Sequence, residues 1–240
     1  MAVRLKEIST RAPQGRDKDK SKAELVQLKA ELEVLQYDLF ARGKDSVLVV
    51  LQGLDASGKD GAIKNVFSGM NPMGVSVKAF KKPSEEEAKH DYLWRVHKEA
   101  PEKGMIKIFN RSHYEDILVP GVEKWIDARE IKERIKHLNA FEALLRSTDT
   151  HILKFYLHCS DEERLQRLQE RQSDPRKKWK YNDGDMQVFE KRKEYIEMYE
   201  RIFADCSKAV KWHIVPSDQN WWKEHYIATE MVKLLRKLTR

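Results

Sequence analysis

The stretch GLDASGKDGAIK at residues 53–64 has the glycine spacing and the lysine of a loop that binds phosphate. Gly53 and Gly58 allow the backbone to turn its N–H groups inward around phosphate oxygens. Lys59 supplies a positive charge, and a helix starting near Lys59 or Asp60 adds the positive end of its dipole. A buried-type strand before the loop and a helical pattern after it favour this interpretation over a purely structural turn. The stretch therefore predicts a phosphate site.

We assign phosphate contacts to the loop and to the first turns of the following helix. The residues are Gly53, Ala56, Ser57, Gly58, Lys59, Asp60, Gly61 and Lys64.

Two carboxylates make this loop more acidic than an ordinary phosphate loop. Asp60 stands where such loops commonly carry the serine or threonine that binds magnesium. It is either a metal ligand or a charge that neutralises the helix N-terminus. Asp55 lies inside the loop, where a bare carboxylate would repel phosphate, so it binds metal or exchanges a proton. We expect Mg²⁺ as cofactor, with Asp55 and Asp60 as its ligands.

A second polar cluster follows the hydrophobic start of IKIFNRSHYEDILV, residues 106–119. Ligands bind at the carboxyl ends of parallel strands, which is where this cluster falls. Arg111 and Glu115 are four residues apart, so in a helical turn they share a face and either grip a phosphate and its metal together or form a simple salt bridge. His113 receives no role. Together with Asp55 and Lys59, Arg111 and Glu115 form the expected catalytic set.

A basic stretch, RLQERQSDPRKKWKYNDGD, forms the third motif. A solvated charged helix is the ordinary explanation of such a run. Because Asp-Pro interrupts it, a hinged lid that closes over phosphate is favoured, with Trp179 packing as an anchor or stacking on a base.

Alternating strand and helix patterns must position these motifs. Four short apolar runs have the character of buried strands: SVLVVLQG, MIKIFN, HILKFYLH and KWHIVP. Leucines at three- and four-residue steps in residues 23–40 predict an amphipathic helix that covers the core, in preference to a coiled-coil seam. Capping boxes at SEEE (84–87) and SDEE (160–163) predict two helix starts. The fold class is α/β, with a parallel sheet flanked by helices.

The 240 residues suit one domain, which we place at 21–240 with a lid insert at about 165–190, after a flexible basic arm at 1–20. The net charge of +7 favours an anionic partner. Two cysteines without a CxxC pattern, and the lack of an apolar leader or an 18-residue apolar run, predict a cytoplasmic protein without membrane association.

Three motifs in register, GLDASGKDGAIK, FNRSHYED and DPRKKWK, resemble the second family of polyphosphate kinases. The resemblance extends from about residue 20 to WHIVPSDQNWWKEHYIA. It implies a P-loop kinase fold with a helical lid, Mg²⁺ dependence, and phosphoryl transfer between inorganic polyphosphate and a nucleotide. It also implies a homo-oligomer, dimer or tetramer, with the helix at 23–40 as a candidate contact.

By motif matching, the resemblance assigns lid residues to the polyphosphate or nucleotide phosphates. These residues are Arg171, Lys177, Trp179 and Lys180. FNRSHYE, with Glu115, resembles the branches that phosphorylate nucleoside monophosphates, some of which continue to the triphosphate. The expected substrates are therefore AMP, ADP, GMP or GDP with polyphosphate, and ATP as product or reverse substrate.

Two other functions share some of these features. An ATP-dependent nucleotide or small-molecule kinase would have the same loop and lid. A nucleic-acid-binding module would suit the basic charge, but the sequence has no recognised nucleic-acid motif, so no nucleic-acid partner is expected. A GTPase is disfavoured because no N-K-x-D motif for guanine is present.

Overall fold

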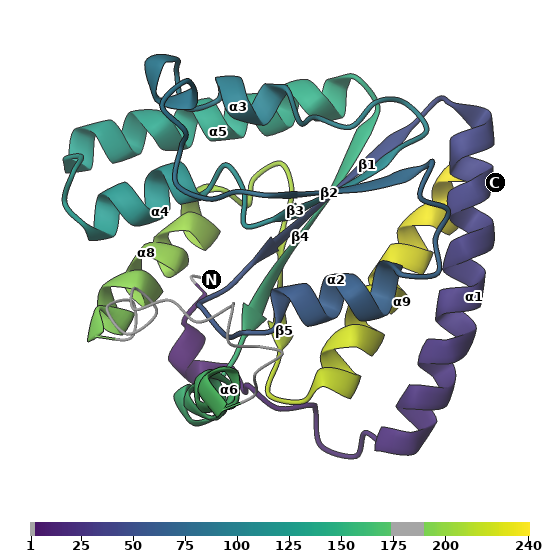
Figure 1. Cartoon of the computed structure of the whole chain (residues 1–240). Coiled ribbons are helices and arrows are strands. Elements are labelled where there is room, and N and C mark those ends of the chain that lie inside the picture. The colour runs from purple at the N-terminus through teal and green to yellow at the C-terminus, as the bar shows by residue number, and fades with distance from the viewer. Residues whose placement is uncertain (1–2, 174–189) are drawn as a thin grey trace.

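A parallel five-stranded sheet forms the centre of the computed structural model, with strand order β2-β3-β1-β4-β5 (Figure 1). The structure describes residues 3–173 and 190–240. The strands are β1 (Ser46–Gln52), β2 (Val75–Ala79), β3 (Ile106–Asn110), β4 (Thr150–His158) and β5 (Trp212–Pro216). The expected parallel sheet of the α/β class is thus confirmed.

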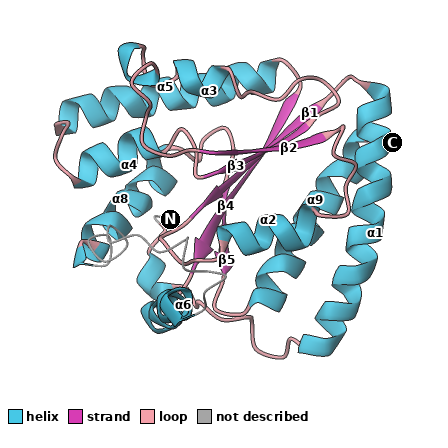
Figure 2. Cartoon of the chain, viewed as in Figure 1, coloured by secondary structure: helices cyan, strands magenta, loops and turns pink. Residues whose placement is uncertain are grey.

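Helices cover both faces of the sheet (Figure 2). On one side lie α1 (Lys18–Arg42), α2 (Lys59–Phe67) and α9 (Asn220–Leu238). On the other lie α3 (Trp94–His97), α4 (Glu115–Val122), α5 (Ala128–Ser147) and α8 (Arg192–Asp205). The remaining elements are α6 (Asp161–Ser173) and the 3₁₀ turns η1 (Leu5–Glu7) and η2 (Glu87–Lys89).

The central strand β1 supplies both halves of the hydrophobic core. Leu48 and Val50 pack into the cluster under α4, α5 and α8, while Val47, Val49 and Leu51 pack into the cluster under α1, α2 and α9. Successive side chains of a strand point to opposite faces, so a continuous apolar run is what a doubly covered strand requires. This explains why SVLVVLQ identifies the strand that carries the phosphate loop.

The four strands expected from apolar runs are present, but β2 was missed. None of its side chains is fully buried: Val75, Ser76 and Lys78 are half-buried and Val77 and Ala79 are exposed. In the described part of the chain, β2 lies at the edge of the sheet and pairs with β3 alone. VSVKA thus lacks the continuous apolar run by which the other four strands were predicted.

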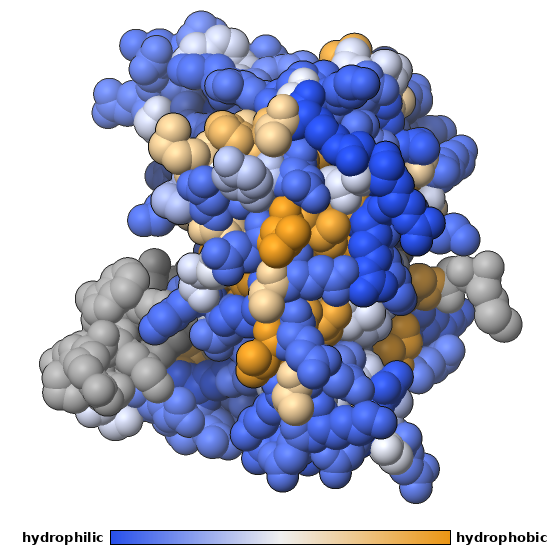
Figure 3. All heavy atoms as spheres, turned by 90° about the vertical axis from the view of Figure 1, so that its right-hand side faces the viewer, coloured by the Kyte–Doolittle hydropathy of each residue, from blue (hydrophilic) through white to orange (hydrophobic). Residues whose placement is uncertain are grey.

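The leucine stripe of α1 faces the molecule. Leu32 and Leu39 are buried, and Leu25, Leu28 and Leu35 pack against the same cluster, which includes α9. The helix therefore covers the core, as expected. Its opposite side faces solvent and also carries hydrophobic side chains, visible among hydrophilic ones in Figure 3.

The two capping boxes begin elements of different length. At residues 84–87 both reciprocal bonds form, Glu87 N to Ser84 Oγ (3.1 Å) and Ser84 N to Glu87 Oε2 (2.9 Å), yet the box leads only into the short turn η2. At residues 160–163 the Glu163 N–H donates to Ser160 Oγ at 3.3 Å, and α6 begins. A capping box therefore marks a start but does not set the length of the helix.

The segment before α1, expected as a flexible arm, lies against the rest of the chain. Leu5 is buried and its N–H donates to Glu200 Oε1, while the Thr10 hydroxyl donates to Asp218 Oδ2 at 2.6 Å. Asp17 caps α1 by accepting from Lys20 N, so the helix begins at Lys18, before the boundary expected at residue 21. Within the described residues, no helix is long and apolar enough to cross a membrane.

Candidate active site

The loop between β1 and α2 has the backbone conformation of a phosphate cradle. Gly53, Ala56 and Gly58 all have positive φ angles, of 149°, 63° and 97°. A Cβ at Gly53 would lie 2.7 Å from Ser57 Oγ and 2.9 Å from the Leu157 carbonyl, so only glycine fits there. The hydroxyl of Ser57 is buried and has no hydrogen-bond partner among the described residues. The loop thus leaves a polar donor available beside its backbone amides.

Lys59 is the first residue of α2 and folds back over the loop. Its ammonium donates to the carbonyls of Gly53 at 2.7 Å and Leu54 at 3.2 Å. Burial lowers the pKa of Lys59 to about 8, although Asp55 draws it upward. An ammonium held in this way is poised to exchange carbonyl contacts for phosphate oxygens.

Asp55, Arg111 and Glu115 come together at the carboxyl ends of β1 and β3. Arg111 Nη2 lies 2.5 Å from Asp55 Oδ1, and Arg111 Nη1 lies 3.8 Å from Glu115 Oε2. Arg111 itself has a positive φ of 61°, and its N–H donates to the Leu51 carbonyl, which ties the turn after β3 to β1. The expected catalytic residues therefore share one site, and the sequence alternative of an Arg111–Glu115 salt bridge also holds in this structure.

Burial and charge act against each other at this site. Burial raises the pKa of Glu115 above its ordinary value, even though Arg111 and Lys59 draw it down. For Arg111, burial is outweighed by Asp55 and Glu115, which raise its pKa. Arg111 is thus a permanent cation, and its side chain remains 37% exposed and accessible to an anion.

A small hollow adjoins these charges. It is lined by Gly53, Leu54, Asp55, Arg111, Glu115, Leu118, Val119, Tyr195 and Tyr199. Gln52 connects its walls, because Gln52 Nε2 donates to Ser112 Oγ at 3.0 Å and Tyr199 OH donates to Gln52 Oε1 at 3.2 Å. Residues of α4 and α8 therefore close the cradle on the side facing away from α2.

The other assigned residues of the loop lie on the first turns of α2. Asp60 accepts a hydrogen bond from Asn110 Nδ2 at 2.8 Å, across the ends of β1 and β3. Gly61 has open space where a Cβ would stand, and Lys64 is exposed one turn further along. Asp60 therefore joins the end of β3, whereas Lys64 lies further from the loop.

Three cationic side chains that received no role from the sequence donate hydrogen bonds to backbone carbonyls of the phosphate loop. Arg164 Nε donates to the Asp55 carbonyl at 2.9 Å, Arg167 Nη1 to the Ala56 carbonyl at 3.1 Å, and Lys223 Nζ to the Gly58 carbonyl at 3.2 Å. Lys223 is fully buried, and burial, assisted by Arg167, lowers its pKa to about 8. The Arg164–Arg167 spacing on α6 was the available sequence signal, but nothing local links Lys223 to a loop 165 residues away.

His113, which received no role, is structural. It is buried with Nε2 3.3 Å from Glu142 Oε1, and Tyr114 OH donates to the same oxygen at 2.5 Å. Lys154 donates to Glu142 Oε2 at 2.7 Å beneath them. Burial would raise the pKa of Glu142, but His113 and Lys154 outweigh it and hold that pKa low. This buried network fixes the turn that carries Arg111 and Glu115.

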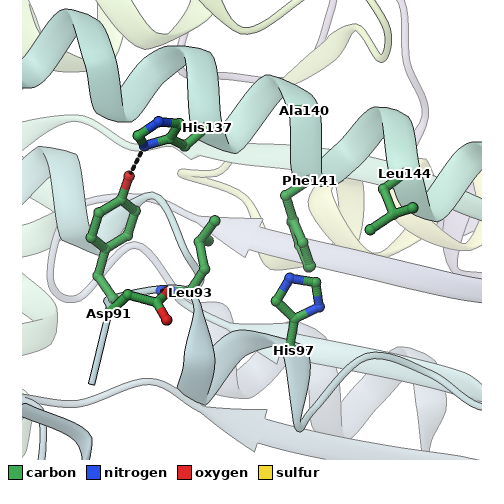
Figure 4. Close-up of a pocket in the computed structure, with 8 residues that line it drawn as sticks. Asp91, Leu93, His97, His137, Ala140, Phe141 and Leu144 are labelled. Atoms are coloured by element: carbon green, nitrogen blue, oxygen red, sulfur yellow. Dashed lines mark hydrogen bonds between the residues drawn. The ribbon is translucent and has the colours of Figure 1, made fainter. Parts of the chain in front are cut away.

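A second hollow, of about 470 Å³, lies between α3 and α5 (Figure 4). Its lining is largely apolar, with His97 edge-on to Phe141 and Tyr92 OH 2.6 Å from His137 Nδ1. It shares no lining residue with the phosphate cradle, so it is separate from the candidate active site.

The expected lid lies mostly outside the described residues. Lys177, Trp179 and Lys180 fall in residues 174–189, and the side chain of Arg171 is also outside them. The structure describes the two helices that flank this insert, α6 and α8. The lid therefore stays a prediction.

The sequence of the chain as a whole matches a known protein family. Residues 15–239 match the model of the family described as polyphosphate kinase 2. The chain belongs to the polyphosphate kinase 2 family.

Among the relatives of this polyphosphate kinase 2 chain is the AMP/ADP-polyphosphate phosphotransferase of Meiothermus ruber, 44% identical over 215 residues, which cover 89% of this chain and 80% of that protein. The ADP-polyphosphate phosphotransferase of Rhodopseudomonas palustris is 36% identical over 209 residues, with 81% and 72% covered. The crystal structure of polyphosphate kinase 2 from Arthrobacter aurescens TC1 superposes with a TM-score of 0.94 at 35% identity and covers 98% of this chain and 86% of that one.

Proposed function

We propose that the chain transfers a phosphoryl group reversibly from inorganic polyphosphate to nucleoside mono- and/or diphosphates, namely AMP, ADP, GMP and GDP. The observation that carries this proposal is the Asp55–Arg111–Glu115 cluster directly above a phosphate loop that contains Lys59. Membership of the polyphosphate kinase 2 family supports the donor, and the names of the relatives support nucleotide acceptors.

The residues of the site suffice for phosphoryl transfer without a strong general base. The acceptor phosphate is already an anion near neutral pH, so catalysis requires alignment and positive charge around the transferred group. Lys59 and the loop amides bind one phosphate end, and Arg111 is exposed toward the same space. Asp55 orients Arg111 and the entering phosphate oxygen.

The donor set also fits Mg²⁺. No cluster of three or more His, Cys, Asp or Glu side chains suited to a metal occurs in the described part of the chain. Mg²⁺ in phosphotransferases usually binds one or two carboxylates together with substrate phosphates, so a larger cluster is not required. Asp55 and Asp60 would hold the ion, with Glu115 nearby, and Mg²⁺ would neutralise charge between the two polyanions.

Glu115 supports use of a nucleoside monophosphate, because FNRSHYE resembles the branches that accept one. The chain acts as a homo-oligomer in the cytoplasm, without a nucleic-acid or membrane partner. Two free, buried cysteines are consistent with a reducing compartment.

The test is an assay without ATP. Purified protein is incubated with Mg²⁺, polyphosphate and, separately, AMP, ADP, GMP or GDP, and the products are separated by chromatography. We expect phosphorylated nucleotide from polyphosphate, a large loss in Lys59→Ala, and little change in Lys132→Ala, an exposed lysine of α5. Turnover only with ATP as donor would instead identify an ATP-dependent kinase.

A further inference from the structure

The ammonium of Lys223 lies beside the phosphate loop without an acidic partner. Its side chain comes from α9, is fully buried, and donates to two neutral oxygens, the Gly58 carbonyl at 3.2 Å and Asn220 Oδ1 at 2.7 Å. Among the described residues, no carboxylate forms an ion pair with it, and Glu224 acts on it only as a more distant charge. A buried ammonium that only neutral groups contact is costly, because burial removes it from water.

A second cation adds to this cost. Arg167 of α6 donates from Nη1 to the Ala56 carbonyl, and a Cβ on Gly58 would meet both this Nη1, at 3.1 Å, and Lys223 Nζ. The two positive groups thus converge on one glycine, and burial, followed by Arg167, lowers the pKa of Lys223 to about 8. Arg167 is paired with Glu163 at 2.8 Å. The charge of Lys223 is therefore the one that lacks a countercharge.

Lys223 contacts a peptide group whose N–H is available to a ligand. The Gly58 carbonyl and the Lys59 N–H belong to one peptide group, and that N–H has no acceptor in the described part of the chain. A cation on the carbonyl oxygen polarises the peptide group and makes its N–H a stronger donor. Arg164 stands in the same relation to the Asp55 carbonyl, which shares a peptide group with the N–H of the next residue.

We propose that Lys223 is a positioning residue of the phosphate loop, whose ammonium holds the Gly58–Lys59 peptide group and supplies a countercharge to the phosphate that binds there. The Gly58 carbonyl also accepts from the Ala62 N–H at 3.0 Å, and Asn220 is exposed to water, so neither acceptor needs the ammonium. The loop backbone is thus satisfied without Lys223, and the charge serves the ligand. The inference rests on the proposed function, because it requires a phosphate at this loop.

The first test compares ligand binding with stability in one variant. Lys223→Met keeps the length of the side chain and removes its charge. Its affinity for inorganic tripolyphosphate, measured by calorimetry in the presence of Mg²⁺, should fall about tenfold or more, the scale of a unit charge a few ångströms from a phosphate in a partly buried site. Its unfolding midpoint without ligand should stay the same or rise, because an unpaired buried charge opposes folding. An unchanged affinity, or a lower midpoint, overturns the proposal.

Two other lysines are the matched controls. Lys233→Met removes an exposed lysine from the same helix and should leave the affinity unchanged. Lys154→Met removes a buried lysine that is paired with Glu142 at 2.7 Å, so its unfolding midpoint should fall clearly. A similar fall in Lys223→Met would show that Lys223 is a structural residue.

The second test restores the charge. Lys223→Arg keeps a cationic donor for the Gly58 carbonyl and should bind tripolyphosphate at least about threefold more tightly than Lys223→Met. Equal affinities in two folded variants would show that the loop does not use this charge, and would overturn the proposal.

Lys59→Ala, measured in the same way, separates this inference from the proposed function. If Lys59→Ala binds tripolyphosphate as tightly as the wild type, the phosphate loop is not the binding site and both fail. If Lys59→Ala weakens binding and Lys223→Met does not, the proposed function stands and only the role of Lys223 fails.

Discussion

The guanidinium of Arg111 lies 2.5 Å from the carboxylate of Asp55 and so joins the turn after β3 to the phosphate loop after β1. The two charges neutralise each other here, and Glu115 faces the same guanidinium at 3.8 Å. A phosphate that enters the site must therefore share Arg111 with Asp55. The Asp55 carboxylate therefore positions the Arg111 guanidinium and also competes with phosphate for it.

We expect Asp55→Asn and Arg111→Met each to lower kcat by at least about a hundredfold, the scale of a lost transition-state contact. Because the two residues act as a unit, the double variant should be far less impaired than the product of the single effects. Steady-state kinetics with polyphosphate and nucleotide measure this. The exposed pair Arg201–Asp205, changed in the same way, should leave kcat nearly unchanged. Additive losses at Asp55 and Arg111 would show that they act separately.

Two glycines of the same loop should respond differently to alanine. In Gly53→Ala, the new Cβ meets the Leu157 carbonyl at 2.9 Å at a φ of 149°, so stability should fall by about 1–3 kcal/mol and activity with it. Gly61→Ala adds a methyl group into open space within a helix and should be neutral or stabilising by up to about 1 kcal/mol. Thermal unfolding compares the two. Equal losses would mean that the loop geometry described above is incorrect.

Deprotonation of Lys59 should lower kcat/KM for polyphosphate on the alkaline side of its pH profile. Its pKa is lowered to about 8, so the ligand-free enzyme loses this charge as pH rises through about 8, and kcat/KM for polyphosphate should fall there. In Lys59→Arg, any residual activity should extend to higher pH, because arginine stays protonated. A profile that falls at the same pH in both proteins would assign the limb to another group.

The lowered pKa of Lys59 also makes the free energy of unfolding depend on pH. The unfolded chain binds this proton up to about pH 10.5, the folded chain only to about pH 8, so folding becomes more favourable as pH rises between these values. The contribution is about 3 kcal/mol at most. Urea titrations of wild type and Lys59→Met at pH 7 and 10 should show a smaller rise in the variant. An identical rise would mean that Lys59 is not desolvated.

The buried pair Lys154–Glu142 should matter more than a surface pair. Removing one partner, in Lys154→Met or Glu142→Gln, leaves a buried charge without its ion-pair partner and should cost about 3–5 kcal/mol. The exposed pair Lys136–Glu133 is the matched control, and its removal should leave the stability nearly unchanged, because solvent screens the two charges. Denaturant unfolding measures both. Similar costs for the two pairs would contradict the burial of the network.

Sequence patterns predicted the parts of this molecule that depend on local chemistry. The apolar run of β1, the glycines of its loop and the motif after β3 place Asp55, Lys59 and Arg111 at one end of the sheet. The features that the patterns missed depend on distant contacts. Lys223 reaches Gly58 only after the whole chain has folded, and β2 lacks the apolar run of a doubly covered strand.

The leucines of α1 give a second example of what spacing alone leaves undecided. Spacing identified the helix and its leucines, but the leucines alone do not tell whether they face the core or another subunit. Packing against α9 assigns them to the core, and this leaves the other side of α1 as the exposed one.

The hydrogen bond from Arg111 N to the Leu51 carbonyl belongs to the backbone and not to any side chain. We therefore expect this bond to keep the loops after β1 and β3 together when the side chains of residues 55, 111 or 115 are exchanged. Under the proposed function, in which Glu115 supports use of a nucleoside monophosphate, a change of acceptor preference would need new side chains at positions such as 115 but no new scaffold.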